Sequence, residues 1–315
     1  MIATITLNPC LDEYIFVDIL TVDETNRWVK RHQYAGGKGI DVARAIHEMD
    51  GITTAYGFIG GNNGRRVEIL LDEEGVLFSF TPIRNETRTN FVIVDKATKY
   101  QTLIGAPGPR VTKKEYQRFC YKLNSIRPVP DMISIGGSAP PGSPDNIYSD
   151  IISSSKARGI RVIFDVAGKW LEEGLKAKPY MIKPNVHEAE ELLGRTLGDE
   201  GEIIKAALDL VDDGIEIVLI SRGSAGLIAA SRDNLYRVIP PKVRVHSAVG
   251  AGDCTVAGFA LRLSRNEPLI EACRLGGAMG AAAVMTAGTE LCHRDNVLKL
   301  LPKVKIEELK ISDYR

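Results

Sequence analysis

Residues 217–221 read Ile-Val-Leu-Ile-Ser and run directly into Arg-Gly-Ser-Ala-Gly at residues 222–226. A short apolar run that ends in a glycine turn is typical of a buried strand in a parallel sheet. Similar strand-like runs occur at residues 132–135, 161–165, 180–182 and 235–239. Helical patterns alternate with them, at residues 112–123, 144–158 and 199–213. This alternation predicts an α/β fold with a mostly parallel central sheet flanked by helices.

The N-terminal part of the chain carries a different pattern. Within residues 12–34 and 88–105, apolar and polar side chains alternate, which predicts half-exposed antiparallel strands. No low-complexity linker and no internal repeat divides the chain. We therefore expect one α/β domain over residues 1–315, with inserted ribbons at 12–34 and 88–105. Because exposed strand edges need a cover or a partner, these ribbons are candidates for a small antiparallel β lid.

The composition is that of a globular protein and argues against several classes of function. Lys plus Arg and Asp plus Glu both number 40, so the net charge of zero provides no field that would attract nucleic acid or an anionic membrane. The five cysteines are scattered without a CxxC pair, which argues against a metal cage or a disulfide framework. No uncharged apolar stretch approaches ~20 residues, and no basic leader opens the chain. We therefore expect a cytoplasmic protein with reduced thiols, no nucleic-acid partner and no membrane contact.

The strongest chemical signal is Val249-Gly250-Ala251-Gly252-Asp253, which opens a helical pattern. Two glycines and an alanine let the backbone approach a ligand, and the free N–H groups and dipole of a helix start favour an anion. Asp253 then has two interpretations. It caps the helix, which is the commoner role of an aspartate near a helix start, or it serves as a general base beside a transferring phosphoryl group.

Two other glycine-containing loops are candidate phosphate sites. In Gly36-Gly37-Lys38-Gly39 a lysine precedes a helical pattern, which suits a phosphate as well as it suits a solvated surface loop. Ser221, Gly223 and Gly226 follow a strand, where α/β proteins place nucleotides, although a plain tight turn is the commoner explanation. The chain has neither a GxxxxGK[ST] motif nor a GxGxxG motif after its first strand, which argues against a P-loop protein and a dinucleotide-binding protein.

The segment Lys183-Pro184-Asn185 with Glu188 also has two interpretations. Asn185 and Glu188 have the spacing of a capping box at the start of a helix. Alternatively, Lys183, Asn185 and Glu188 face a nucleotide triphosphate and its Mg²⁺, a cation that prefers carboxylates and retained waters. The five histidines have no spacing typical of a metal site.

Together, these four motifs resemble the PfkB (ribokinase-like) carbohydrate kinases, and the resemblance runs essentially from end to end. The opening Thr6-Leu7-Asn8-Pro9 and the loop Gly137-Ser138-Ala139-Pro140-Pro141-Gly142 add to it. The most similar branch is that of the phosphosugar kinases, which includes 1-phosphofructokinases, tagatose-6-phosphate kinases and the minor bacterial 6-phosphofructokinases. The resemblance implies a ribokinase-like fold with a β lid, the use of ATP and Mg²⁺, and a homodimer in which the lid strands of two subunits pair.

The resemblance also implies roles for individual residues. Asp253 is the catalytic base, and the backbone of Gly250, Ala251 and Gly252 forms the anion hole beside it. The residues implied for the acceptor sugar are Asp12, Gly37, Lys38, Asp41, Arg88 and Ser138. The residues implied for the nucleotide are Lys183, Asn185, Ser221, Gly223 and Gly226, with Glu188 acting on Mg²⁺ through water.

Some positions depart from the pattern of this branch. Asp41 stands where the family has asparagine, and its charge is able to repel a substrate phosphate. Gly136, Ala139 and Arg222 stand where the branch usually has serine, leucine and an apolar residue. These departures leave the acceptor open. We favour conversion of fructose 1-phosphate to fructose 1,6-bisphosphate, with tagatose 6-phosphate and fructose 6-phosphate as alternative acceptors.

Three further functions remain as alternatives. A non-catalytic sugar-phosphate sensor on the same scaffold is favoured only by Asp41, whereas Asp253 and its glycines argue against it. A kinase for an unphosphorylated sugar or a nucleoside is opposed by Lys38 and Arg88, because a neutral acceptor offers no charge for them to bind. A nicotinamide-dependent oxidoreductase is disfavoured because the dinucleotide-binding motif is missing.

Overall fold

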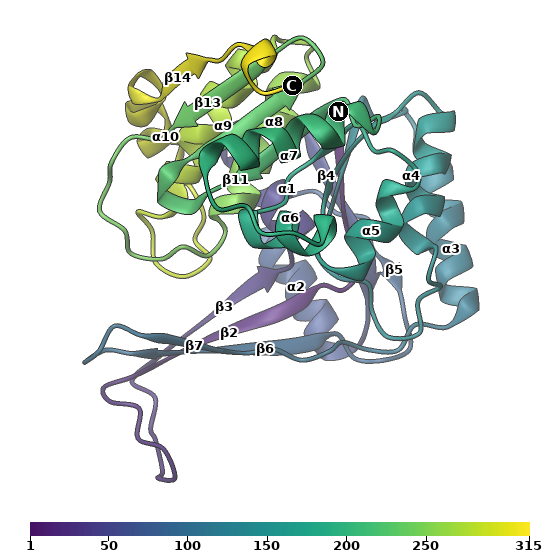
Figure 1. The fold of residues 1–315 in the computed structure, drawn as a ribbon. Coiled ribbons are helices and arrows are strands. Elements are labelled where there is room, and N and C mark those ends of the chain that lie inside the picture. Colours follow the sequence, from purple (N-terminus) through teal and green to yellow (C-terminus); the bar gives the residue numbers. More distant parts are fainter.

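The structure is a computed structural model and describes residues 1–315. Its larger sheet has ten strands in the order β14-β13-β12-β11-β10-β9-β8-β1-β4-β5 (Figure 1). Their bounds are β1 Ile2–Thr6, β4 Thr53–Ile59, β5 Thr81–Pro82, β8 Met132–Gly136, β9 Arg161–Asp165, β10 Met181–Ile182, β11 Ile217–Ser221, β12 Leu227–Ser231, β13 Leu235–Ile239 and β14 Lys305–Glu308. All neighbours from β5 to β11 pair in parallel, and β12, β13 and β14 add an antiparallel edge. The predicted mostly parallel sheet is confirmed, whereas β12 and β14 were not predicted.

Helices cover both faces of this sheet, as the apolar strand runs predicted. Their bounds are α1 Lys38–Glu48, α2 Gly61–Glu73, α3 Lys113–Asn124, α4 Ile147–Ala157, α5 Lys169–Leu175, α6 Val186–Leu193, α7 Glu200–Asp212, α8 Ala251–Leu263, α9 Leu269–Ala283 and α10 Arg294–Leu300. None of these helices has both the length and the apolar character needed to cross a membrane.

Strand β11 shows why the central runs are apolar throughout. Successive side chains of a strand point to opposite faces of its sheet. Val218 and Ile220 pack into the core formed with α4 and α7, whereas Ile217 and Leu219 pack into the core formed with α8 and α9. Because both faces are covered, neither set of positions tolerates a polar residue, and the alternation typical of a half-exposed strand disappears.

The smaller sheet has four strands in the order β3-β2-β6-β7 and projects from the body of the molecule (Figure 1). Its strands are β2 Cys10–Val17, β3 Lys30–Gly36, β6 Arg88–Asp95 and β7 Gln101–Ile104. β2 and β3 form one antiparallel pair and β6 and β7 form another, as predicted, and a parallel pairing of β2 with β6 joins the two. The Asp95 carboxylate accepts hydrogen bonds from the backbone N–H groups of Ala97 and Thr98, which fixes the turn between β6 and β7.

The tightest helix contact lies between α8 and α9, within the small-residue stretch near the C-terminus. A Cβ atom added to Gly258 of α8 would lie 2.7 Å from the Cα and the N of Gly276 in α9. The two backbones therefore pack directly on each other. This contact fixes the position of α8, whose first turn carries Asp253.

We expect Gly258→Ala to lower the free energy of unfolding by ~1–3 kcal/mol, the usual cost of overpacking a core. Alanine is the better helix former by about 1 kcal/mol, so a net loss would show that the backbone contact outweighs helix propensity. Gly201→Ala in α7 is the matched control, because its Cβ would meet only the carboxylate end of Asp199, at 3.2 Å. Urea unfolding of both variants measures the difference. A Gly258→Ala variant as stable as Gly201→Ala would contradict the contact.

Candidate active site

The candidate residues gather at the carboxyl edge of the large sheet, where α/β proteins place their ligands. Asn8 follows β1, Ser138 follows β8, Asp165 ends β9, Lys183 follows β10 and Ser221 ends β11. A cavity of about 780 Å³ lies at the opposite edge, because its lining includes residues that directly precede β10 and β11. That cavity is therefore separate from the candidate site.

An ion cluster forms the centre of this edge, with Asp165 and Lys183 buried and Lys38 partly exposed. The Lys38 ammonium donates a hydrogen bond to Asp165 Oδ1 at 3.3 Å, and Lys183 Nζ lies 3.5 Å from the same oxygen. Burial opposes the ionisation of Asp165, but the charges of Lys183 and Lys38 outweigh it and hold the pKa of this carboxyl below its ordinary value. The charge of Asp165 raises the pKa of Lys38 in turn. Lys38 therefore stays charged beside the sheet edge.

The start of α8 lies against this cluster. Gly250 is the N-cap residue and has φ 78°, a left-handed conformation that favours glycine. A Cβ atom added to Gly252 would lie 3.3 Å from Lys183 Nζ, so the helix start and the ammonium face the same space. The first N–H groups of a helix have no partner within it. Backbone donors, a helix dipole and an ammonium thus converge on one point, which suits a phosphoryl group.

Asp253 lies in the first turn of α8 and is 9% exposed. The N-cap residue of α8 is Gly250 and Asp253 stands three residues later, so the interpretation of Asp253 as the residue that caps the helix is wrong. Its Oδ1 atom is buried without a hydrogen-bond partner. Burial raises the pKa of Asp253 to about 6, against the charge of Lys38, which lowers it, and with that of Asp165, which raises it. An unpartnered carboxylate with this pKa is able to accept a proton from a substrate hydroxyl.

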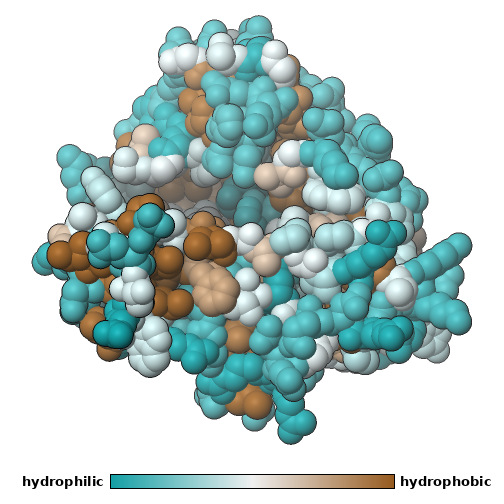
Figure 2. Space-filling view, turned by 90° about the horizontal axis from the view of Figure 1, so that it is seen from below, coloured by the Kyte–Doolittle hydropathy of each residue, from teal (hydrophilic) through white to brown (hydrophobic).

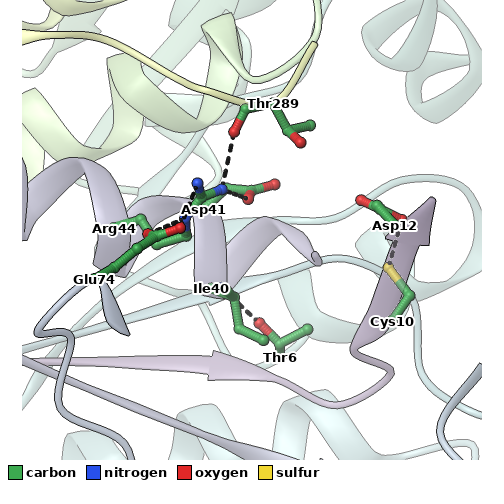
Figure 3. Close-up of polar contacts among 8 residues, drawn as sticks. All are labelled: Thr6, Cys10, Asp12, Ile40, Asp41, Arg44, Glu74 and Thr289. Carbon is green, nitrogen blue, oxygen red and sulfur yellow. Dashed lines mark hydrogen bonds and ion pairs between the residues drawn. The ribbon is translucent and has the colours of Figure 1, made fainter. Parts of the chain in front are cut away.

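Asp12 lies on β2, on the side of the small sheet. Asn90 of β6, directly opposite Asp12 across the parallel pairing, donates a hydrogen bond to Asp12 Oδ1 at 3.0 Å. The Cys10 thiol donates to the same atom at 3.1 Å (Figure 3). Burial raises the pKa of Asp12, and these two hydrogen bonds oppose it. Asn90 was not predicted as a site residue. Its position two residues after Arg88 on a predicted strand indicates that the two side chains lie on the same face of that strand.

Arg88 is already engaged by the backbone. Its guanidinium donates hydrogen bonds to the carbonyl oxygens of Ala106, at 2.7 Å, and Asn8, at 2.9 Å. Its Nε atom is buried without a partner. The Asn8 side chain extends the link, because its amide donates to the carbonyl of Pro107 and, at 3.4 Å, to Ser138 Oγ. Arg88 therefore connects the loop after β1 to the chain that leaves β7.

Asp41 occupies the buried side of α1, three residues after Lys38. Arg44 Nη1 lies 3.4 Å from Asp41 Oδ1, and the same guanidinium donates two hydrogen bonds to Glu74, at 2.6 and 2.9 Å (Figure 3). Arg44 Nη1 also donates to the carbonyl oxygen of Thr289, at 3.0 Å. Arg44 was not predicted as a site residue, and nothing local to its sequence indicates these distant partners.

In the turn after β10, the capping interpretation of residues 185–188 is confirmed. Asn185 Oδ1 accepts from the Glu188 N–H at 2.9 Å, and Glu188 Oε2 accepts from the Asn185 N–H at 2.8 Å. Ser221 lies beside this turn, because its N–H donates to the carbonyl of Pro184. A Cβ atom at Gly226 would overlap the carbonyl oxygen of Val238, which explains this glycine, whereas Gly223 borders open space.

The unusual Arg222 has a structural explanation. Its guanidinium pairs with Glu200 at the start of α7 and donates to the carbonyl of Ala225 at 3.0 Å. Glu200 also pairs with Arg237 of β13. The side chain therefore braces the glycine turn between β11 and β12.

These residues fit the substrates of a phosphoryl transfer. The Lys183 ammonium beside Gly252, together with the open space at Gly223, suits a polyphosphate. Glu188 is half-buried, and only its Oε2 is used in the capping box. A single carboxylate completed by waters and phosphate oxygens is a common setting for Mg²⁺.

Asp165 is the main residue that sequence reasoning missed. Its position at the end of a predicted buried strand was a signal, but its partners lie 127 and 18 positions away. We expect Asp165→Asn to lower the free energy of unfolding at neutral pH by ~2–4 kcal/mol, because it leaves two ammonium groups without their counterion.

The pH dependence of that loss follows from the lowered pKa of Asp165. The pairing stabilises the fold above the ordinary pKa of about 3.9 and is lost as pH falls through the lower pKa of the folded state. The difference between the wild type and Asp165→Asn should therefore shrink in acid. Asp209→Asn is the control, because its pairing with Arg195 is exposed and worth ~0–1 kcal/mol. Equal losses in the two variants, measured by urea unfolding, would contradict the buried cluster.

The chain is similar in sequence and in fold to known proteins over almost its whole length. The chain is 33% identical over 309 residues to a 1-phosphofructokinase of Bacillus subtilis, covering 98% of this chain and 100% of the relative. It is 31% identical to a 1-phosphofructokinase of Borreliella burgdorferi, covering 99% and 100%. The crystal structure of phosphofructokinase-2 from Escherichia coli in complex with substrates and products superimposes with a TM-score of 0.91 at 32% identity, covering 96% of this chain and 98% of that one. Residues 5–296 match the pfkB family carbohydrate kinases, and the chain belongs to this family.

Proposed function

We propose that this chain is an ATP-dependent kinase that transfers the γ-phosphoryl group to a hydroxyl of a phosphorylated ketohexose. One observation carries the proposal. Asp253 is buried with an unpartnered carboxylate oxygen, next to a helix start and two ammonium groups. A proton acceptor and a phosphate-binding point thus lie side by side, which is what phosphoryl transfer to a hydroxyl requires.

Asp253 takes the proton of the attacking hydroxyl as that oxygen approaches the phosphorus in line. The N–H groups of Gly250, Ala251 and Gly252 stabilise the charge of the transferring group, and the dipole of α8 adds to them. These donors are held in place before the reaction, so little reorganisation is needed at the transition state.

ATP lies across the loops at the carboxyl edge of β10 and β11. Lys183 and Asn185 face its phosphates, and the turn formed by Ser221, Gly223 and Gly226 accommodates the nucleotide. Glu188 would hold Mg²⁺ through water, and the cation would supply positive charge to the phosphate oxygens. The small sheet closes over the acceptor as a lid and excludes water, which limits wasteful hydrolysis of ATP.

The acceptor lies between α1, the small sheet and the loop after β8. The residues proposed to contact it are Asp12, Gly37, Lys38, Asp41, Arg88 and Ser138. Fructose 1-phosphate is the favoured acceptor, because the relatives from Bacillus subtilis and Borreliella burgdorferi are named 1-phosphofructokinases, although phosphofructokinase-2 of Escherichia coli matches at a comparable identity. Fructose 6-phosphate and tagatose 6-phosphate are the competing acceptors.

An assay of ADP release over a panel of sugars tests this function. We expect kcat/KM to be highest for fructose 1-phosphate, lower for fructose 6-phosphate and tagatose 6-phosphate, and lowest for free fructose and nucleosides.

Asp253→Asn should lower turnover by ~10²-fold or more, the scale of general-base loss. In the wild type, turnover should fall as pH drops below about 6, because Asp253 becomes protonated. A chain that releases no ADP with any sugar, or retains turnover without Asp253, would refute the proposal.

We further propose that the chain is a cytoplasmic homodimer whose lids pair. All five cysteines are unpaired, as expected in a reducing compartment. The lid carries large exposed apolar side chains, including Trp28 at 60%, Leu103 at 66% and Phe91 at 41% exposure. Figure 2 shows apolar side chains gathered on the side of the lower face where the lid projects. Edge strands with exposed apolar residues require a partner.

Leu103→Glu places a charge on edge strand β7 and should convert the dimer to a monomer. Sedimentation equilibrium measures this directly, since the subunit mass is 34.4 kDa and the wild type should show twice that value. Ile52→Glu is the control, because Ile52 is 71% exposed and lies outside the lid. A monomeric wild type would contradict the proposal, as would a Leu103→Glu variant that remains dimeric.

A further inference from the structure

Asp41 stands apart among the acids of the site. It is buried on α1, 6% exposed, in the same helix turn as Lys38. Its Oδ1 contacts Arg44 at 3.4 Å, which is a long and weak contact for an ion pair. Its Oδ2 makes no hydrogen bond within the protein, and the side chain keeps 9% exposure. One carboxyl oxygen is therefore left for a ligand.

The charge around Asp41 does not balance if its carboxyl is ionised. Arg44 is the nearest cation, but its guanidinium makes two short hydrogen bonds to Glu74 and a third to the carbonyl of Thr289 (Figure 3). Two carboxylates would therefore share one guanidinium that is already engaged. The next cation, Lys38, is paired with Asp165. One proton added to the group of Asp41, Glu74 and Arg44 restores neutrality.

The groups that face Asp41 from neighbouring elements reinforce this imbalance. Its ionisation is opposed first by burial and then by the charge of Asp253 on α8, and favoured by Arg44, so the pKa of Asp41 lies well above its ordinary value. The titratable and charged groups around it are Asp12, Cys10 and Tyr14 on β2, Lys38 and Arg44 on α1, Asp253 on α8 and Glu74 after α2. Acids outnumber free cations in this set.

We propose that Asp41 works in its protonated form, as a neutral hydrogen-bonding residue that selects the phosphorylated acceptor. A protonated carboxyl has one O–H donor and keeps acceptor capacity, the same pair of functions as an asparagine amide. A neutral Asp41 therefore donates a hydrogen bond to an oxygen of the acceptor. It also removes the like-charge repulsion that an ionised carboxylate would exert on the acceptor's phosphate.

This inference rests on the proposed function, because it concerns a sugar phosphate at the same site. The inference gives different roles to Asp41 on α1 and Asp253 on α8. Asp253 must be ionised to take a proton, whereas Asp41 must keep its proton to bind. The two carboxyls lie close enough for the charge of one to oppose ionisation of the other, so a single proton between them suits both tasks.

The protonation state of Asp41 is measured directly by carbon-13 NMR of protein labelled at the aspartate carboxyl carbons. Asp41→Asn assigns the resonance, because it deletes one signal. We expect this carboxyl to remain protonated at pH ~7, well above the ordinary aspartate pKa of about 3.9. A resonance already ionised at pH 7 would overturn the inference.

Glu74→Gln provides a matched test outside the acceptor pocket. It removes the negative charge that pairs with Arg44, so the charge of the guanidinium is left to balance Asp41. The pH at which the Asp41 carboxyl ionises should then fall. If the Asp41 carboxyl ionises at the same pH in Glu74→Gln as in the wild type, the charges around Arg44 do not keep Asp41 protonated, and the inference is wrong.

Kinetics give an independent readout at neutral pH. For the best phosphosugar of the panel, kcat/KM of Asp41→Asn should stay within about tenfold of the wild type, whereas Asp41→Ala should fall by ~10²-fold because a hydrogen bond to the acceptor is lost. The KM for ATP should change little in both variants. If both variants exceed the wild type, an ionised Asp41 repels the phosphate and the inference is wrong. Failure of the proposed function itself is distinguishable, because the wild type would then release no ADP with any phosphosugar.

Discussion

The carboxylate of Asp165 organises the candidate site. It joins the end of β9 to the first turn of α1 through Lys38 and to the end of β10 through Lys183. A buried carboxylate without partners costs several kcal/mol, so the fold tolerates Asp165 only with both ammonium groups in place. The same contacts hold the two ammonium groups at the carboxyl edge of the sheet, where Gly252 leaves room for α8 to begin beside Lys183. One electrostatic constraint therefore sets the geometry of the proposed phosphoryl-transfer point.

The other cations of the site, Arg44 and Arg88, already form hydrogen bonds within the protein. Arg44 donates hydrogen bonds to Glu74 and to the carbonyl of Thr289. Arg88 donates hydrogen bonds to the carbonyls of Asn8 and Ala106. For the proposed phosphate contacts, Lys38, Lys183 and backbone N–H groups are therefore the main donors, and Arg88 adds its charge from the position fixed by these hydrogen bonds. The protonation states of Asp12, Asp41 and Asp253 are therefore important, because each ionised carboxylate weakens the attraction of these cations for a phosphate. Burial raises the pKa of all three and reduces that opposition.

The sequence predicted those features that depend on local patterns. The buried strands were recognisable because both faces of the sheet are covered, and the capping box at Asn185 and Glu188 depends on a spacing of three residues. Strand β14, Lys305–Glu308, was missed because it is largely exposed and carries a single apolar residue. Asp165 and Arg44 were missed because their partners lie far away in the chain. Long-range pairing follows from the completed fold, which no local window contains.

Asp253 illustrates how the structure changes the meaning of a local pattern. Aspartate in the first turn of a helix ordinarily satisfies or complements the free N–H groups there. In α8 the N-cap is Gly250, no side chain caps the helix, and the Asp253 carboxylate keeps an unpartnered oxygen. Unsatisfied donors and acceptors in a buried setting reduce stability, so their presence together requires a compensating role. A transferring phosphoryl group would satisfy the donors, and an attacking hydroxyl would satisfy the carboxylate. The local cost in stability is thus the same feature that makes the site competent for the proposed reaction.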